Sequence, residues 1–101
     1  MGQNEDLYAD MMHKGLTPEV AETLALDGLA FVVADSGRLE RFLRLTGLKG
    51  ATLRARASDP DVLRAVLDFL LTDDSLVEDF CREQGLEPRD LHLAHRLLGG
   101  P

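Results

Sequence analysis

Apolar residues recur along the chain at intervals of three and four, the spacing that places them on one face of a helix. No stretch alternates at the two-residue period of a strand. The pattern predicts helices from Pro18 to about residue 34, about 38–46, about 50–57, from Pro60 to the polar run 72–75, from there to Gly85, and from Pro88 to the glycines 99–100. We expect an all-α fold of about six helices, with residues 1–16 as a mobile N-terminal tail and residues 17–101 as a single helical domain.

Residues with strong local preferences mark the helix boundaries. Thr17 and Asp59 each precede a proline, so each side chain can accept from a free backbone amide while the proline takes the first helical position. Gly47 and Gly85 stand where a left-handed C-terminal cap is needed. The first helix is apolar on more than one side, which predicts a central position. The expected buried residues include Ala21, Leu24, Ala25, Leu29, Phe31, Val32 and Val33 in this helix, Leu39, Phe42 and Leu43 in the next, and Leu97 in the last.

The segments 24–57 and 62–95 are similar over their whole length. A shift of 38 residues aligns them without a gap and makes nine positions identical. These pairs are Leu29 with Leu67, Phe31 with Phe69, Asp35 with Asp73, Glu40 with Glu78, Phe42 with Phe80, Arg44 with Arg82, Gly47 with Gly85, Leu48 with Leu86, and Leu53 with Leu91. The match predicts two similar three-helix units. We expect the units to face each other and share one core.

Composition is consistent with a soluble domain that needs no cross-link. The chain has 101 residues, of which 45% are hydrophobic, and Cys81 is its one cysteine, so no intrachain disulfide can form. Its first residues are polar and acidic, unlike an export signal. The longest apolar run, 29–34, is far shorter than a membrane span. We therefore expect a cytoplasmic protein with no membrane partner.

The charge is unevenly distributed. A formal net charge of −7 disfavours generic binding to nucleic acid or anionic lipid. Between residues 38 and 56, however, a basic segment has Glu40 as its single acid and contains six cations: Arg38, Arg41, Arg44, Lys49, Arg54 and Arg56. These cations could contact nucleic acid or a protein partner. They could equally neutralise acidic helices packed beside them or across a dimer contact.

The basic segment also has the outline of a helix-turn-helix motif. Leu43, Gly47, Leu48 and Leu53 show the required spacing, and the cations after the turn could meet phosphates or base edges. The same spacing is required of any glycine-capped helix that is followed by a packed helix. The second copy of the pattern, around Gly85, lacks the positive charge.

Catalytic and metal-binding patterns are missing from the sequence. It contains no glycine-rich phosphate loop, paired-cysteine site, HExxH helix or nucleophile elbow. His92 and His95 stand one helical turn apart, but two imidazoles need a further ligand to hold a metal, and a partly buried structural role suits His95. Cys81 occupies an apolar helical position, where an inert thiol is usual. We expect no enzymatic activity, no cofactor and no metal.

Three blocks of sequence resemble a known family. ETLALDGLAFVVADSGRLERFLRLTGL, LRARASDPDVLRAVLDFLLTDDSLVEDF and GLEPRDLHLAHRLLGG, which together span about residues 20–100, are similar to a family of small, uncharacterised alphaproteobacterial proteins, a domain of unknown function. Lys49 and Gly50 depart from the expected acid and proline, which Glu87 and Pro88 supply in the second half. The resemblance implies no activity, ligand or catalytic residue.

The repeat, the missing catalytic patterns and the apolar surplus favour a small non-catalytic helical module that binds another protein or itself. The alternative is a nucleic-acid-binding protein that uses the helix-turn-helix-like unit around residues 38–56. The sequence does not specify the partner or the process.

Overall fold

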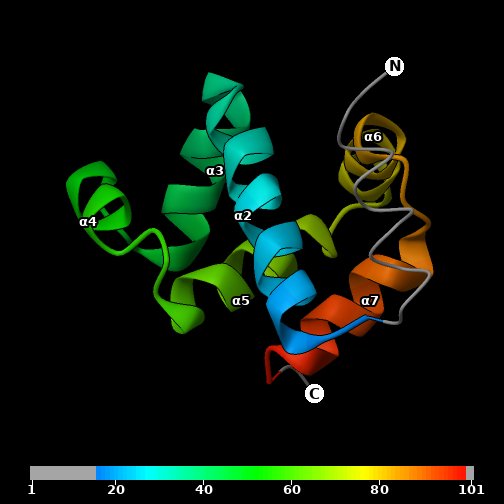
Figure 1. Ribbon diagram of the computed structural model, residues 1–101. Helices are drawn as coiled ribbons and strands as arrows, with labels where there is room; N and C mark the ends of the chain where they lie inside the picture. Colours follow the sequence, from blue (N-terminus) through cyan, green and yellow to red (C-terminus); the bar gives the residue numbers. More distant parts are fainter. Residues whose placement is uncertain (1–15, 100–101) are drawn as a thin grey trace.

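The computed structural model describes residues 16–99, and these form six α-helices and no strand (Figure 1). The helices are α2 (Pro18–Val33), α3 (Ser36–Thr46), α4 (Gly50–Ala55), α5 (Pro60–Leu70), α6 (Asp74–Gln84) and α7 (Pro88–Leu97). The prediction of an all-α fold with about six helices is confirmed. The predicted tail falls almost wholly on residues 1–15, which lie outside the described residues, so the division into tail and domain stays a prediction.

Side-chain caps begin the helices and glycine caps end them, close to where the sequence indicates. Thr17 Oγ1 accepts a hydrogen bond from the Val20 amide at 3.2 Å. Gly47 and Gly85 have φ angles of 75° and 71°, so both left-handed caps are confirmed. The helix predicted from residue 38 begins two residues earlier, because Asp35 Oδ2 accepts from the Arg38 amide and caps the new helix at once.

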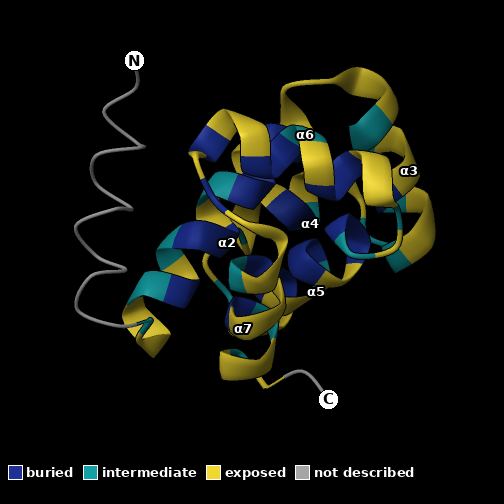
Figure 2. Ribbon diagram, turned by 90° about the vertical axis from the view of Figure 1, so that its right-hand side faces the viewer, coloured by how far each residue is buried: buried dark blue, intermediate teal, exposed yellow. Residues whose placement is uncertain are grey.

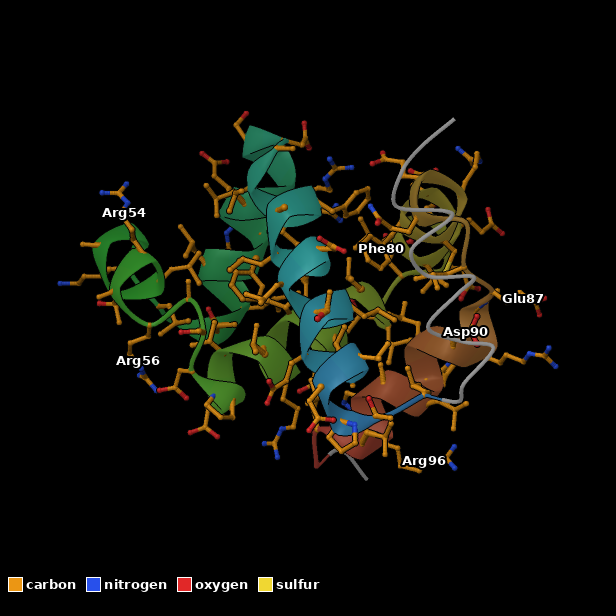
Figure 3. All side chains as sticks on the ribbon, in the orientation of Figure 1. Arg54, Arg56, Phe80, Glu87, Asp90 and Arg96 are labelled. Carbon is orange, nitrogen blue, oxygen red and sulfur yellow. The ribbon has the colours of Figure 1, made fainter. Side chains whose placement is uncertain are left out.

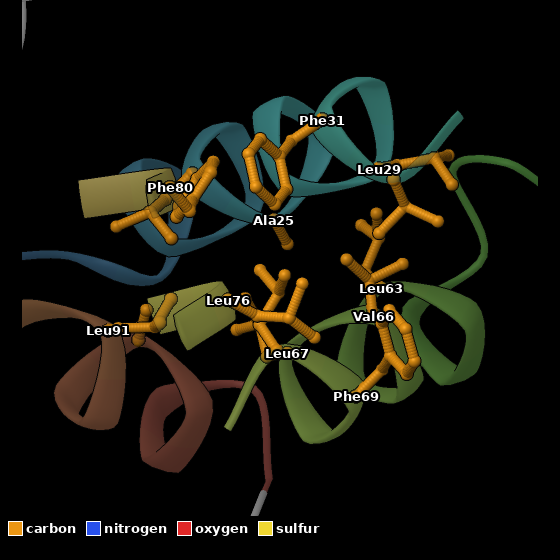
Figure 4. Packing of buried hydrophobic residues seen from close by; sticks show 14 of the residues in the cluster. Ala25, Leu29, Phe31, Leu63, Val66, Leu67, Phe69, Leu76, Phe80 and Leu91 are labelled. Carbon is orange, nitrogen blue, oxygen red and sulfur yellow. The ribbon is translucent and has the colours of Figure 1, made fainter. Parts of the chain in front are cut away.

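Helix α2 lies at the centre of the fold, as its apolar residues predict. It packs against α5, α7 and α3. Figure 2 shows buried residues recurring along α2, and Figure 4 shows Ala25 and Leu29 of α2 meeting Leu63 and Leu67 of α5. An added Cβ at Gly28 would lie 3.1 Å from side-chain carbons of α5, so the two backbones approach closely here. One face of α2 is therefore fully enclosed.

Two edge-to-face aromatic pairs join the first and second halves of the chain. Phe31 packs against Phe80 with ring centroids 5.4 Å apart, and Phe42 packs against Phe69 at 5.5 Å. All four rings belong to one hydrophobic cluster that contains residues of both segments, 24–57 and 62–95. The duplication itself stays a prediction, since α7 packs against α2, α5 and α6 whereas α4 has only slight contact with other helices.

Burial differs from the prediction at the edges of the core. Val33 was expected inside, but 47% of its surface is exposed, and Leu97 is also exposed. In α3 the single fully buried residue is Phe42, while Leu39 and Leu43 are half-buried. Val33 is exposed because α3 and α4 cover less of α2 than α5 and α7 do. No helix within residues 16–99 has the length and apolar character needed to cross a bilayer.

Candidate interaction site

An apolar pocket of about 450 Å³ lies between α2, α3 and α4. It is lined by Leu26, Leu29, Ala30 and Val33 of α2, by Leu39 of α3, and by Gly50, Leu53, Arg54 and Ala57 of the α4 segment. Arg54 is the one charged residue in this lining. Its size and lining are those of a site that receives an apolar side chain or ligand.

The floor of the pocket is an exposed apolar stripe on α2. Leu26, Ala30 and Val33 follow one another at intervals of four and three residues, so they share one face of the helix. All three are exposed, in contrast to the opposite face of α2, which is enclosed by α5 and α7. Helix α2 therefore has a second apolar face without a cover among the described residues.

The pocket is open because α4 is short and loosely attached. Its six residues include a single buried side chain, Leu53. Lys49, at its N-cap position, makes no side-chain capping bond. Figure 1 shows α4 at the edge of the molecule, outside the group formed by the other five helices. This arrangement leaves a wedge between α4 and α2 instead of a packed helix interface.

Two cations of the basic segment are engaged within the fold. The Arg38 guanidinium stacks on the Phe31 ring at 3.7 Å, and its Nε lies 3.9 Å from Asp35 Oδ2. Arg41 Nη1 lies 3.8 Å from Asp73 Oδ2, on the capping residue of α6. These contacts support the neutralising interpretation for Arg38 and Arg41, since an acid stands beside each.

Arg56 is also paired. Its Nη2 and Nε donate to Asp59 Oδ2 at 3.0 and 3.1 Å. The pKa of Asp59 is lowered, first by the hydrogen bond that Asp61 N donates to the carboxylate and then by Arg56. By contrast, Arg44, Lys49 and Arg54 are exposed and form no ion pair with the residues that the structure describes. The basic segment is thus divided into three neutralised and three unpaired cations.

The helix-turn-helix outline is present only locally. Helix α3 ends at the Gly47 cap, and Leu48 and Leu53 turn inward after it. The second helix of the motif is α4, which has six residues. Recognition helices present several side chains to the major groove, and so short a helix offers little room for them. The spacing of Gly47, Leu48 and Leu53 is therefore explained by the glycine cap and the packing after it, and the geometry shows no feature specific to nucleic acid binding.

His95 has a role that the sequence indicates only in part. It is half-buried, as expected, and its Nε2 contacts Asp68 Oδ1, which ties α7 to α5. His92 is exposed. No group of three or more His, Cys, Asp or Glu side chains within residues 16–99 is arranged to hold a metal ion. The Asp68 contact was missed because the two residues are 27 positions apart.

Cys81 is buried, as predicted. Burial, together with the negative charge of Asp90, raises the pKa of its thiol to about 11. The thiolate needed for nucleophilic chemistry is therefore disfavoured at neutral pH.

Comparison with known proteins places the chain in one family. A family model described as "Protein of unknown function (DUF3572)" matches residues 18–101. No curated protein and no solved structure matches the chain. The match covers all six helices.

Proposed function

The chain belongs to the DUF3572 family of proteins of unknown function, and we propose that it is a non-catalytic helical module that binds another protein. The observation that carries the proposal is the apolar pocket between α2 and α4, floored by Leu26, Ala30 and Val33. The non-catalytic part rests on the sequence, which contains none of the catalytic patterns considered above.

Physical reasoning favours a helical partner. Apolar residues at i, i+4 and i+7 form a ridge that packs against the corresponding ridge of a second helix. Leu26 and Val33 are 42% and 47% exposed, so a partner would remove substantial apolar surface from water. At roughly 25 cal/mol per Å² of apolar surface, burial of both would contribute on the order of 1–3 kcal/mol. That gain is modest, which suits a reversible contact.

A helical-peptide library displayed on yeast tests the proposal. The library fixes leucines at i, i+4 and i+7 and varies the remaining positions, and the full chain is the labelled target. We expect selected peptides to lose at least about tenfold in affinity for Leu26→Glu, because a buried carboxylate would remain unpaired. Leu93→Glu is the matched control, since Leu93 has a similar exposure of 41% but lies on α7. Selected peptides that respond equally to both substitutions, or a library without binders, would contradict the proposal.

Nucleic acid binding is the second candidate, and the unpaired cations Arg44, Lys49 and Arg54 favour it. Such binding must weaken steeply with salt. Fluorescence anisotropy with duplex and single-stranded probes at low salt checks this, using Lys49→Ala combined with Arg54→Ala. Micromolar binding that the double variant abolishes would support it. Absence of binding would remove it and leave the pocket as the functional surface.

A further inference from the structure

The wall of the pocket formed by α4 is positively charged. Arg54 lines the pocket, and Lys49 directly precedes Gly50, another lining residue. Neither cation has an ion-pair partner among residues 16–99. Figure 3 shows the Arg54 side chain extending from α4 toward solvent. The apolar floor therefore lies beside one lining cation, Arg54, and a second cation, Lys49, stands at the N-cap position of α4 just outside the lining.

The charge along α2 is of the opposite sign beyond the pocket. Glu22 lies one turn before Leu26 on the same exposed face, so the apolar stripe is preceded by a carboxylate. A partner helix that lies along the stripe would meet positive charge on its α4 edge and negative charge near the start of α2. The charges around the apolar floor are therefore asymmetric, positive at the α4 edge and negative near the start of α2.

Two residues that align with pocket alanines under the 38-residue shift form a polar contact in the second half of the chain. Under the 38-residue shift, Ala30 corresponds to Asp68 and Ala57 to His95. Asp68 and His95 contact each other and hold α7 against α5. The two alanines cannot form such a contact, and both line the open pocket. The first half therefore lacks the polar contact that joins α5 and α7, and the two alanines contribute apolar lining instead.

We propose that the pocket receives an amphipathic helix of another protein, with apolar side chains over Leu26, Ala30 and Val33 and acidic residues along the edge that faces Lys49 and Arg54. This inference rests on the proposed function and adds the chemistry of the partner. Local charge complementarity favours this partner, because Arg54 in the lining and Lys49 beside it attract carboxylates. The net charge of −7 repels an acidic helix from the rest of the surface, so these two cations would determine where it binds. The α4 cations then set the orientation of the helix in the pocket.

The test uses the same peptide library with its leucines fixed. Each position next to a fixed leucine encodes Glu, Lys or Gln in equal proportion. Selection on the full chain is expected to enrich Glu over Lys by about twofold to fivefold at positions on one edge, the range that one exposed ion pair provides. Selection on Lys49→Glu combined with Arg54→Glu is expected to reverse the preference to Lys. The matched control is Arg89→Glu combined with Arg96→Glu, which makes the same change in net charge on exposed residues of α7. This control is expected to keep the Glu preference.

The outcomes distinguish failure of the acidic-partner inference from failure of the proposed protein-binding function. Peptides that require Leu26 but show equal Glu and Lys, or keep their preference in the reversed variant, overturn the acidic partner and leave the protein-interaction proposal standing. Peptides indifferent to Leu26→Glu overturn both.

Two measurements assign the pocket to other occupants. A dimer seen by light scattering that Leu26→Glu dissociates would assign it to a second copy of the chain. Peptide binding seen only after removal of residues 1–15 would assign it to those residues. Either result overturns the acidic partner helix.

Discussion

Replacing Gly28 with alanine tests how closely α2 and α5 approach. The new Cβ would lie 3.1 Å from both Leu70 Cδ1 and Val66 Cγ1, closer than side-chain carbons normally pack. Both neighbours are fully buried, so they cannot move aside without disturbing the core. In an open helical position the change would gain about 1 kcal/mol of helix propensity. Overpacking costs roughly 1–3 kcal/mol, so we expect a net loss of about 1 kcal/mol for Gly28→Ala and a larger loss for Gly28→Val.

Thermal unfolding followed by far-ultraviolet circular dichroism measures this loss. A change of 1 kcal/mol corresponds to a shift of roughly 4–8 °C in the melting temperature of a small domain. Ala30→Gly, on the exposed face of the same helix, calibrates the propensity difference and is expected to lose about 1 kcal/mol. If Gly28→Ala instead gains about as much as Ala30→Gly loses, the space at position 28 is open and the enclosed interface between α2 and α5 is wrong.

Three further results are expected. Gly47→Val should lower the free energy of unfolding by roughly 1–2 kcal/mol. Backbone strain alone causes this loss, because no atom lies within 4 Å of the added Cβ. An unchanged melting temperature would contradict the left-handed cap. Cys81 in the folded chain should react with a disulfide reagent far more slowly than in urea, because its pKa is raised to about 11, and equal rates would mean an exposed thiol. NMR titration should place the pKa of Asp59 below its ordinary value of 3.8, and Arg56→Ala should raise it only partly, since the bond from Asp61 N remains. The stability contributed by ionised Asp59 is then present above pH 3.8 and lost as the pH falls through the folded pKa.

The helix boundaries could be predicted because they depend on neighbouring residues. Thr17 caps an amide three positions away, and Asp59 caps one two positions away. Gly47 and Gly85 each close the turn that precedes them. Such contacts lie within one helical turn, so the sequence contains both partners side by side. The sequence also indicated that α2 is central, since its apolar residues extend around the helix.

The candidate site depends on contacts between distant segments and could not be predicted in the same way. Val33 has the spacing of a core residue, but its exposure depends on how far α4 reaches across α2. Arg41 looks like a free cation in the sequence, and Asp73 of the other half neutralises it. The contact between Asp68 and His95 joins residues 27 positions apart, so the residues next to either one give no sign of it.

Isotope-filtered NMR of the full chain with a selected acidic peptide tests most directly whether the wedge between α2 and α4 is the docking site. The labelled methyl groups of Leu26 and Val33 should show intermolecular NOEs to the leucines of the peptide. NOEs confined to Leu93 and Leu97, two exposed leucines one turn apart on α7, would contradict it.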